Sequence, residues 1–325
     1  MKTLKSIALL LLCSLLTIFA CQTKQPPIDA QGRPLIEKIG TIDCDMVETT
    51  PVVFKNKAYR FEYVRTNYWD NKTGDSYFRF VDHETGEKTP PFAKGFHFGS
   101  AFVYDNTVYV TAVNKGDGEQ IHIFKSLDLE HWDSWMAFEL KGWGMFNTSM
   151  TRANDKFVLM FEVGKPEIEA GSPFTAHFAT STDLKNWEIL SRDHNYAMDR
   201  YTAPHCLRYL DGYYYDFYLE SIEGGYEARV VRSKDLIKWE ASPLNPILKA
   251  SPKDKQIANK ALPDSLIHKI AIADDWNNSD IDFCEYQGKL IINYSWGNQL
   301  GKEFLGEAVY HGTQEQFLKG WFPAK

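Results

Sequence analysis

Three acidic residues stand where strand-like runs begin or end, and they could carry acid–base chemistry. Glu48 and Asp280 each precede such a run, and Glu220 closes the aromatic run Tyr213–Leu219. Two carboxyl groups break a glycosidic bond when one, with a raised pKa, protonates the leaving oxygen and the other activates water. The apolar neighbours of Glu220 favour a raised pKa, so it is the expected acid, with Glu48 or Asp280 as the base.

Each of these carboxylates also has a structural alternative. Glu48 could cap a turn or pair with an arginine, and Asp280 could belong to an Asx turn in the stretch 277–280. Glu220 could lie on a solvated strand end. The acid–base pair is therefore a hypothesis about which side chains meet in the folded chain.

Further polar and aromatic residues are expected around the same centre. If the first strand of every hairpin lines one axis, the residues that enter those strands converge at one face. The second strands return to that face and bring Glu62, Glu162, Glu220 and Trp296 to its rim. The residues expected to contact a substrate are His97, Asn147, Arg200, His205, Asp282 and Trp296. Such a set suits a sugar, because aromatic rings can stack on its C–H faces, although Arg200 could instead pair with a carboxylate.

The elements that must position these residues are five similar hairpins. Each consists of two strand-like runs around a small polar turn, such as Asp211-Gly212, and they recur about every 50 residues. The hairpins span Pro51–Tyr63, Ser100–Val113, Ser149–Val163, Tyr201–Glu220 and Ile281–Tyr294.

The pattern S-x-D-L-x-x-W follows three of these hairpins. It occurs at Ser126–Trp132, Ser181–Trp187 and Ser233–Trp239, in each case after a third strand-like run and before a fourth. One unit is therefore a four-stranded antiparallel blade. Such a blade cannot bury its own faces alone, so five units predict an all-β fold, a five-bladed β-propeller. The aspartates of the repeated turn, Asp128, Asp183 and Asp235, are expected to be structural.

The fifth unit is one strand short, and the period is interrupted before it. The run Glu37–Asp45 is expected to complete this unit and close the ring, which removes open sheet edges. A short helical insertion is expected between blades four and five, with its helix at Pro263–Asp274. A second short helix is expected at Thr313–Gly320 near the C-terminus.

The amino-terminal segment has the features of a targeting signal. Lys2 and Lys5 precede the apolar run Ile7–Phe19, and the small residue Ala20 precedes Cys21. This order resembles a bacterial lipoprotein signal, which implies cleavage before Cys21 and lipidation of its thiol; an ordinary secretory signal is the alternative. The expected organisation is a signal peptide at 1–20, a tether at 21–38 and the propeller at 39–325. The protein is expected in the cell envelope, lipid-anchored and facing the periplasm or the cell surface.

The net charge and the cysteine spacing bear on which partners and cofactors the protein could bind. The net charge of −7 becomes −9 without Lys2 and Lys5, and no basic cluster is present, which argues against nucleic acid. Cys44, Cys206 and Cys284 lack zinc-type spacing and are expected to be free thiols, although one disulfide is possible. No cofactor is expected to be required, although the acidic stretch 274–282 could ligate a structural calcium ion. A monomer is expected.

Taken together, the hairpins, the S-x-D-L-x-x-W turns and the stretch D-G-Y-Y-Y at 211–215 resemble the five-bladed propeller glycoside hydrolases of family 43 and the related families 32, 62, 117 and 130. The likeness covers about residues 39–311 and is more specific for fold than for activity. It implies a hydrolase of poly- or oligosaccharides, for which exo action and inversion are expected.

The chain departs from family 43 at the positions that matter for catalysis. Family 43 enzymes generally carry acidic residues where this chain has Thr50, Asn147 and Thr202. Either the chain uses a shifted set of carboxylates or it is not a hydrolase. A non-catalytic glycan-binding propeller and an interaction scaffold in an envelope complex are the alternatives.

Overall fold

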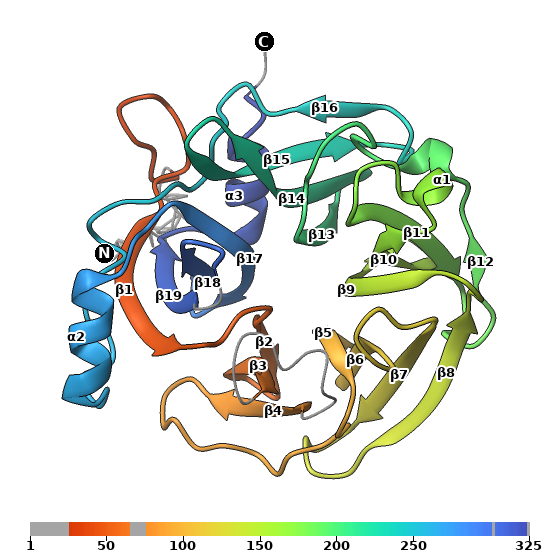
Figure 1. Cartoon of the computed structure of the whole chain (residues 1–325), viewed down its shortest axis with the longest axis horizontal. Helices are drawn as coiled ribbons and strands as arrows, with labels where there is room; N and C mark the ends of the chain where they lie inside the picture. Colours follow the sequence, from red (N-terminus) through yellow and green to blue (C-terminus); the bar gives the residue numbers. More distant parts are fainter. Residues whose placement is uncertain (1–25, 66–75, 301–302, 324–325) are drawn as a thin grey trace, which may run out of the picture.

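The computed structural model describes residues 26–65, 76–300 and 303–323, and these form five antiparallel sheets around a common axis (Figure 1). In each sheet the first strand of the hairpin lies innermost, so β2, β5, β9, β13 and β17 surround the centre. The predicted five-bladed β-propeller is therefore confirmed.

The blades follow the chain in order. Blade one contains β2 (Thr50–Phe54), β3 (Lys57–Arg65) and β4 (Ser76–Asp82). Blade two contains β5 (His97–Tyr104), β6 (Thr107–Val113), β7 (Gln120–Ser126) and β8 (Asp133–Glu139). Blade three contains β9 (Gly144–Ala153), β10 (Lys156–Lys165), α1 (Glu167–Ala170), β11 (Thr175–Ser181) and β12 (Glu188–Ile189). Blade four contains β13 (His205–Leu210), β14 (Tyr213–Ile222), β15 (Gly225–Ser233) and β16 (Trp239–Ala241), preceded by a 3-10 helix (Arg192–His194).

Blade five closes the ring as predicted. It contains β17 (Asn277–Tyr286), β18 (Lys289–Gly297) and β19 (Glu303–Tyr310), and its outer strand is β1 (Glu37–Cys44) from the other end of the sequence. The helix α3 (Gln314–Gly320) follows, with a capping box at Thr313, and packs its buried Phe317 against this half of the propeller. Because β1 begins at Glu37, the ordered strand starts two residues before the predicted boundary at 39.

Blade one differs from the four-stranded pattern, because its fourth segment makes only isolated bridges. The segment 88–92 contacts β4 at Lys88 and Phe92 but is not a continuous strand. Pro90 and Pro91 within it have no N–H to donate to a sheet ladder, which explains why the pairing is interrupted.

The repeated turns have the structural role that the sequence predicted. In the first, Asp128 Oδ1 accepts hydrogen bonds from the backbone N–H groups of Glu130 and His131, at 2.9 and 2.8 Å. Leu129 occupies the left-handed region with φ 68° and its side chain is buried. Asp183 and Asp235 repeat this arrangement in blades three and four.

The insertion packs against the closing strand and ends at the inner strand of blade five. Thr41 of β1 exchanges backbone hydrogen bonds with this segment, and Lys38 forms a buried ion pair of 2.7 Å with Asp254. The predicted helix is α2 (Asp264–Ile272), which lies outside β1 in Figure 1. From α2 the polypeptide runs through Trp276 into β17, where Asp280 is located.

Candidate active site

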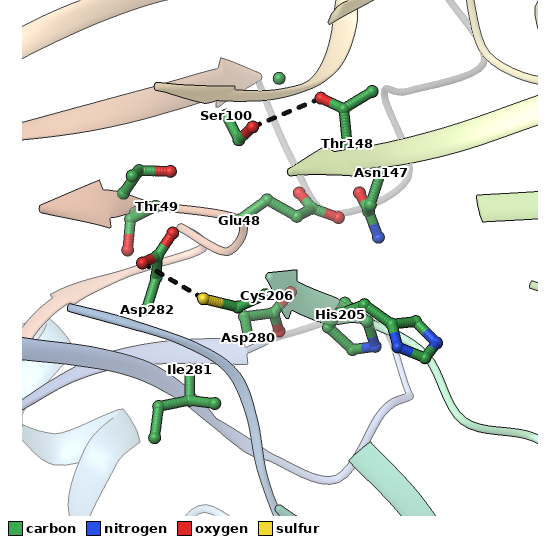
Figure 2. Close-up of a pocket in the computed structure, with 13 residues that line it drawn as sticks. Glu48, Thr49, Ser100, Asn147, Thr148, His205, Cys206, Asp280, Ile281 and Asp282 are labelled. Atoms are coloured by element: carbon green, nitrogen blue, oxygen red, sulfur yellow. Dashed lines mark hydrogen bonds between the residues drawn. The ribbon is translucent and has the colours of Figure 1, made fainter. Parts of the chain in front are cut away.

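Two cavities that share lining residues lie on the propeller axis. The outer cavity has a volume of about 350 Å³, and the inner one, shown in Figure 2, about 30 Å³. Glu48, Asn147, Pro204 and Asp280 line both. The inner strands thus bring together segments that are more than 200 residues apart in the sequence.

Three carboxylates from three blades line the outer cavity. Glu48 lies just before β2, Glu162 lies on β10, and Asp280 lies on β17 at an irregularity in the pairing with β18. Glu48 and Asp280 both occupy the left-handed region, with φ 50° and 51°. Non-glycine residues rarely adopt this conformation, and where they do it often belongs to a functional site. Here it lies at the two acidic residues that enter inner strands.

Different groups contact each carboxylate. Glu48 faces Arg65, whose guanidinium lies 3.5 Å from Oε2. Asp280 accepts a hydrogen bond of 2.6 Å from the hydroxyl of Ser279. Glu162 accepts two hydrogen bonds of 3.1 Å, one from the side-chain amide of Asn147 and one from the backbone N–H of His205. No cation pairs with Glu162 among the residues that the structure describes.

Burial raises the pKa of all three carboxyl groups, and repulsion from neighbouring carboxylates adds to the rise for Glu48 and Glu162. Burial raises the pKa of Glu48 to about 7; Asp280 adds to this rise and Arg65 opposes it. Burial, followed by the charges of Asp280 and Glu48, raises the pKa of Glu162 well above its ordinary value. Burial also raises the pKa of Asp280, although hydrogen bonds from Ser279, Ser295 and the Glu48 backbone oppose the rise. Because two anions face Glu162 and only neutral donors contact it, Glu162 is the group that holds a proton most firmly.

Aromatic rings form one wall of the outer cavity. Neighbouring ring centroids lie 5.3 Å apart for Phe98 and Phe146, 4.7 Å for Phe146 and Phe174, and 6.1 Å for Phe174 and Tyr201. Tyr226 extends the series at 6.3 Å from Tyr201. All five rings line the cavity. A row of ring faces and edges beside carboxylates suits a ligand with both C–H faces and hydroxyl groups.

The structure does not bring Glu220 to this group. Its carboxylate lies 3.4 Å from Arg200 and 3.9 Å from Arg229, and it accepts a hydrogen bond of 2.8 Å from the Tyr218 hydroxyl. Neither cavity is lined by Glu220 or Arg200. Arg200 thus pairs with a carboxylate, that of Glu220, which is the alternative role that the sequence left open for it.

Two of the residues expected to contact substrate lie in the packed interior. The ring of His97 is fully buried, its Nδ1 lies 2.5 Å from the Tyr63 hydroxyl, and burial lowers its pKa to about 4. Trp296 is also fully buried; it stacks on Phe304 at 4.5 Å, and its indole N–H donates to the Thr41 hydroxyl. Neither residue lines the two cavities.

Three of the expected contact residues, Asn147, His205 and Asp282, line the axial cavities. Asn147 lines both cavities and donates to Glu162, as described above. His205 lines the inner cavity, with its Nδ1 2.9 Å from a fully buried carboxylate oxygen of Asp216. Asp282 lines the inner cavity, pairs with Arg208 and accepts from the Cys206 thiol at 3.4 Å (Figure 2).

The three positions where family 43 generally has acidic residues have other roles here. Thr50 accepts a hydrogen bond from the backbone of Ala101 at 3.3 Å and so links blades one and two. Asn147 is the donor to Glu162, and Thr202 is fully buried. The carboxylates that line the outer cavity lie elsewhere: Glu48 two residues before Thr50, Glu162 on the second strand of blade three, and Asp280 on the inner strand of blade five.

The described residues contain no group of three or more histidine, cysteine, aspartate or glutamate side chains that could hold a metal ion, including at the acidic stretch 274–282. Cys44, Cys206 and Cys284 are free thiols, with Cys44 only half-buried. No helix in the described ranges is long and apolar enough to cross a membrane. The predicted signal peptide at 1–20 and the predicted lipidation site Cys21 lie outside the described residues.

The fold resembles solved glycoside hydrolase structures at low sequence identity. One of them, a glycoside hydrolase, matches with a TM-score of 0.59 and 11% identity over 86% of this protein and 94% of that one. A thermostable family-43 glycoside hydrolase matches at 0.56 and 12% identity, over 82% and 90%. The α-L-arabinofuranosidase PaAbf62A from Podospora anserina, in complex with cellotriose, matches at 0.54 and 10% identity, over 89% and 95%. No family model and no curated protein matches the sequence. The comparisons confirm the predicted resemblance in fold.

Proposed function

We propose that this protein is a glycoside hydrolase that cleaves a poly- or oligosaccharide in the cavity at the propeller axis. The observation that carries the proposal is the meeting of Glu48, Glu162 and Asp280 in one cavity beside an aromatic wall. Burying three carboxyl groups together costs stability unless protons or cations compensate them. An arrangement that keeps one carboxyl protonated beside one that is ionised is what glycoside hydrolysis needs.

In this proposal Glu162 is the general acid. Burial and the charges of Asp280 and Glu48 raise its pKa well above its ordinary value, which favours the protonated form that a general acid needs. The hydrogen bonds from Asn147 and the His205 backbone hold its carboxyl group in place at the cavity wall. Glu162 therefore replaces Glu220, the acid expected from the sequence, as the group that protonates the leaving oxygen.

Asp280 is the proposed base. Hydrogen bonds from two serine hydroxyls and a backbone N–H favour its charged form, so it ionises before Glu162. The inner cavity beside Asp280 and Glu48 has room for about one water molecule. A water there would lie on the side of the sugar that faces the inner cavity. Inversion needs a water on the face opposite the leaving group, so this position supports it. Glu48 would then act mainly through its charge, by raising the pKa of Glu162.

The outer cavity also bears on substrate size. Its volume of about 350 Å³ is at the small end of ligand sites and suits one or two sugar rings, which supports action at the end of a glycan. A direct test is hydrolysis of aryl α-L-arabinofuranoside, aryl β-D-xyloside, sucrose and β-1,4-xylo-oligosaccharides by the wild type and the Glu162→Gln variant. Activity that falls at least a hundredfold in the variant supports the proposal. Absence of hydrolysis across a wider glycan panel, or an unimpaired variant, contradicts it.

A second candidate is a glycan-binding propeller without catalysis. The observation that favours it is the absence of carboxylates at Thr50, Asn147 and Thr202, where family 43 generally has them. This candidate predicts saturable binding of an oligosaccharide by the wild type without any product. Calorimetric titration together with product analysis separates the two.

We also propose that the protein is a monomer held at the cell envelope by a lipid on Cys21. The support is the order of charged, apolar and small residues before Cys21. In this arrangement the stretch 21–38 would hold the catalytic cavity away from the membrane.

A further inference from the structure

Trp276 has an unusual position beside the catalytic cavity. It is the last residue of the insertion before β17, and 49% of its surface is exposed. Among the described tryptophans no other is this exposed. Its indole makes no hydrogen bond or ring contact with another described side chain. A rigid apolar ring held in solvent is common in recognition sites.

The backbone of Trp276 is fixed on both sides. Its N–H donates to the Gly297 carbonyl at 2.7 Å, and its own carbonyl accepts from the Tyr226 N–H at 3.0 Å. Gly225 permits this approach, because a Cβ there would lie 2.5 Å from the Trp276 carbonyl oxygen. The insertion therefore presents the indole from a backbone that strands β15 and β18 hold in place.

These contacts place the backbone of Trp276 next to residues that line the outer cavity, although Trp276 is not itself a lining residue. Tyr226, to which it is hydrogen-bonded, is the last ring of the aromatic wall. Gln299, two residues after Gly297, also lines the cavity. Trp276 precedes Asp280 by four residues, so its backbone lies at most about 13 Å from the proposed base.

We propose that Trp276 forms a sugar-binding subsite outside the catalytic cavity, where a ring on the leaving-group side of the substrate stacks its C–H face on the indole. This proposal rests on the proposed function, because it assumes that a terminal sugar occupies the cavity and that the rest of the glycan passes over the rim. The substrate is then an oligosaccharide or polysaccharide and not a disaccharide alone. The subsite adds binding energy away from the bond that breaks.

The first test is kinetic and compares substrates of different length. The substrates are β-1,4-xylo-oligosaccharides, or the series that the screen identifies. Trp276→Ala is expected to raise KM for the tetrasaccharide about tenfold and to leave kcat unchanged. In this proposal the indole holds a ring beyond the two that a disaccharide supplies, so the KM of the disaccharide should change less than twofold. Trp276→Phe, which keeps a ring, should recover part of the loss.

Ile272→Ala is the matched control, because Ile272 is 68% exposed at the end of α2 in the same insertion. It should leave both constants unchanged. An equal rise in KM for the disaccharide and the tetrasaccharide in Trp276→Ala would overturn the subsite, because it would indicate a general disturbance of the cavity.

The second test does not depend on turnover. The indole N–H resonance of Trp276, assigned by its loss in Trp276→Phe, is followed while the Glu162→Gln protein is titrated with xylotetraose, cellotetraose and arabinotetraose. A saturable shift with any of them supports the subsite, even if the hydrolysis screen is negative and the proposed function fails. If a tetrasaccharide that the wild type hydrolyses leaves this resonance unmoved, or if none of the three moves it, the subsite is refuted.

Discussion

Replacing Glu48 by glutamine should change how the stability of the fold depends on pH. Burial raises the pKa of Glu48 from 4.5 to about 7 in the folded protein, and in the unfolded chain the group returns to its ordinary value. The folded state therefore binds the proton more tightly. Its contribution to stability is fully present below pH 4.5 and is lost as the pH rises through 7. Since one pKa unit corresponds to about 1.4 kcal/mol, the loss is roughly 3 kcal/mol.

Urea unfolding of the wild type and Glu48→Gln between about pH 4.5 and 8 measures this loss. The free energy of unfolding of the wild type should fall more steeply with pH, and the gap between the two proteins should change by about 3 kcal/mol across the range. The absolute gap also contains the lost contact with Arg65, so the pH dependence is the quantity to compare.

Glu130→Gln serves as the control, because Glu130 is exposed on the turn between β7 and β8. Its curve should run parallel to that of the wild type. If the Glu48→Gln curve is parallel as well, Glu48 titrates normally in the folded protein. Such a result would contradict the statement that burial raises the pKa of Glu48.

Three further predictions concern residues other than the three carboxylates that line the outer cavity. Trp296→Ala should cost about 3–5 kcal/mol of unfolding free energy, because the ring is fully buried against Phe304; urea unfolding that matches the wild type would contradict a packing role. Glu220→Gln should lower kcat less than tenfold, because Glu220 lies outside the cavity in ion pairs; a loss of a hundredfold or more would restore it as the acid. Cys21→Ala should move the protein from the membrane to the soluble fraction of the producing bacterium and abolish palmitate labelling; unchanged labelling would exclude Cys21 as the lipidated residue.

The fold could be predicted because its signal is local and repeated. Each hairpin and each S-x-D-L-x-x-W turn is specified by adjacent residues, as the hydrogen bonds of Asp128 illustrate. The closing strand Glu37–Cys44 followed from a missing strand in the fifth unit. The partial fourth strand of blade one could have been anticipated from Pro90 and Pro91.

The site was harder to predict because it depends on contacts between blades. Glu62, Glu162 and Glu220 all lie on second strands, and the sequence predicted all three at the rim of the face where the inner strands begin. Glu62 pairs with Arg60 and Arg79, and Glu220 pairs with Arg200 and Arg229, whereas Glu162 receives only neutral donors. Hydrophobic patterning also cannot separate a ring that lines a cavity from one in the core, as Trp296 demonstrates.

Whether Glu162 donates a proton to the leaving group can be measured by comparing substrates with different leaving groups in the Glu162→Gln variant. 2,4-Dinitrophenolate leaves without being protonated. The hydroxyl oxygen of a neighbouring sugar is a poor leaving group and needs a proton from an acid. We expect kcat/KM to fall about 10²–10⁴-fold on the oligosaccharide and only a few-fold on the dinitrophenyl glycoside of the same sugar. An equal loss on both substrates would contradict the claim, because Glu162 would then position the substrate or support the cavity without acting as the acid.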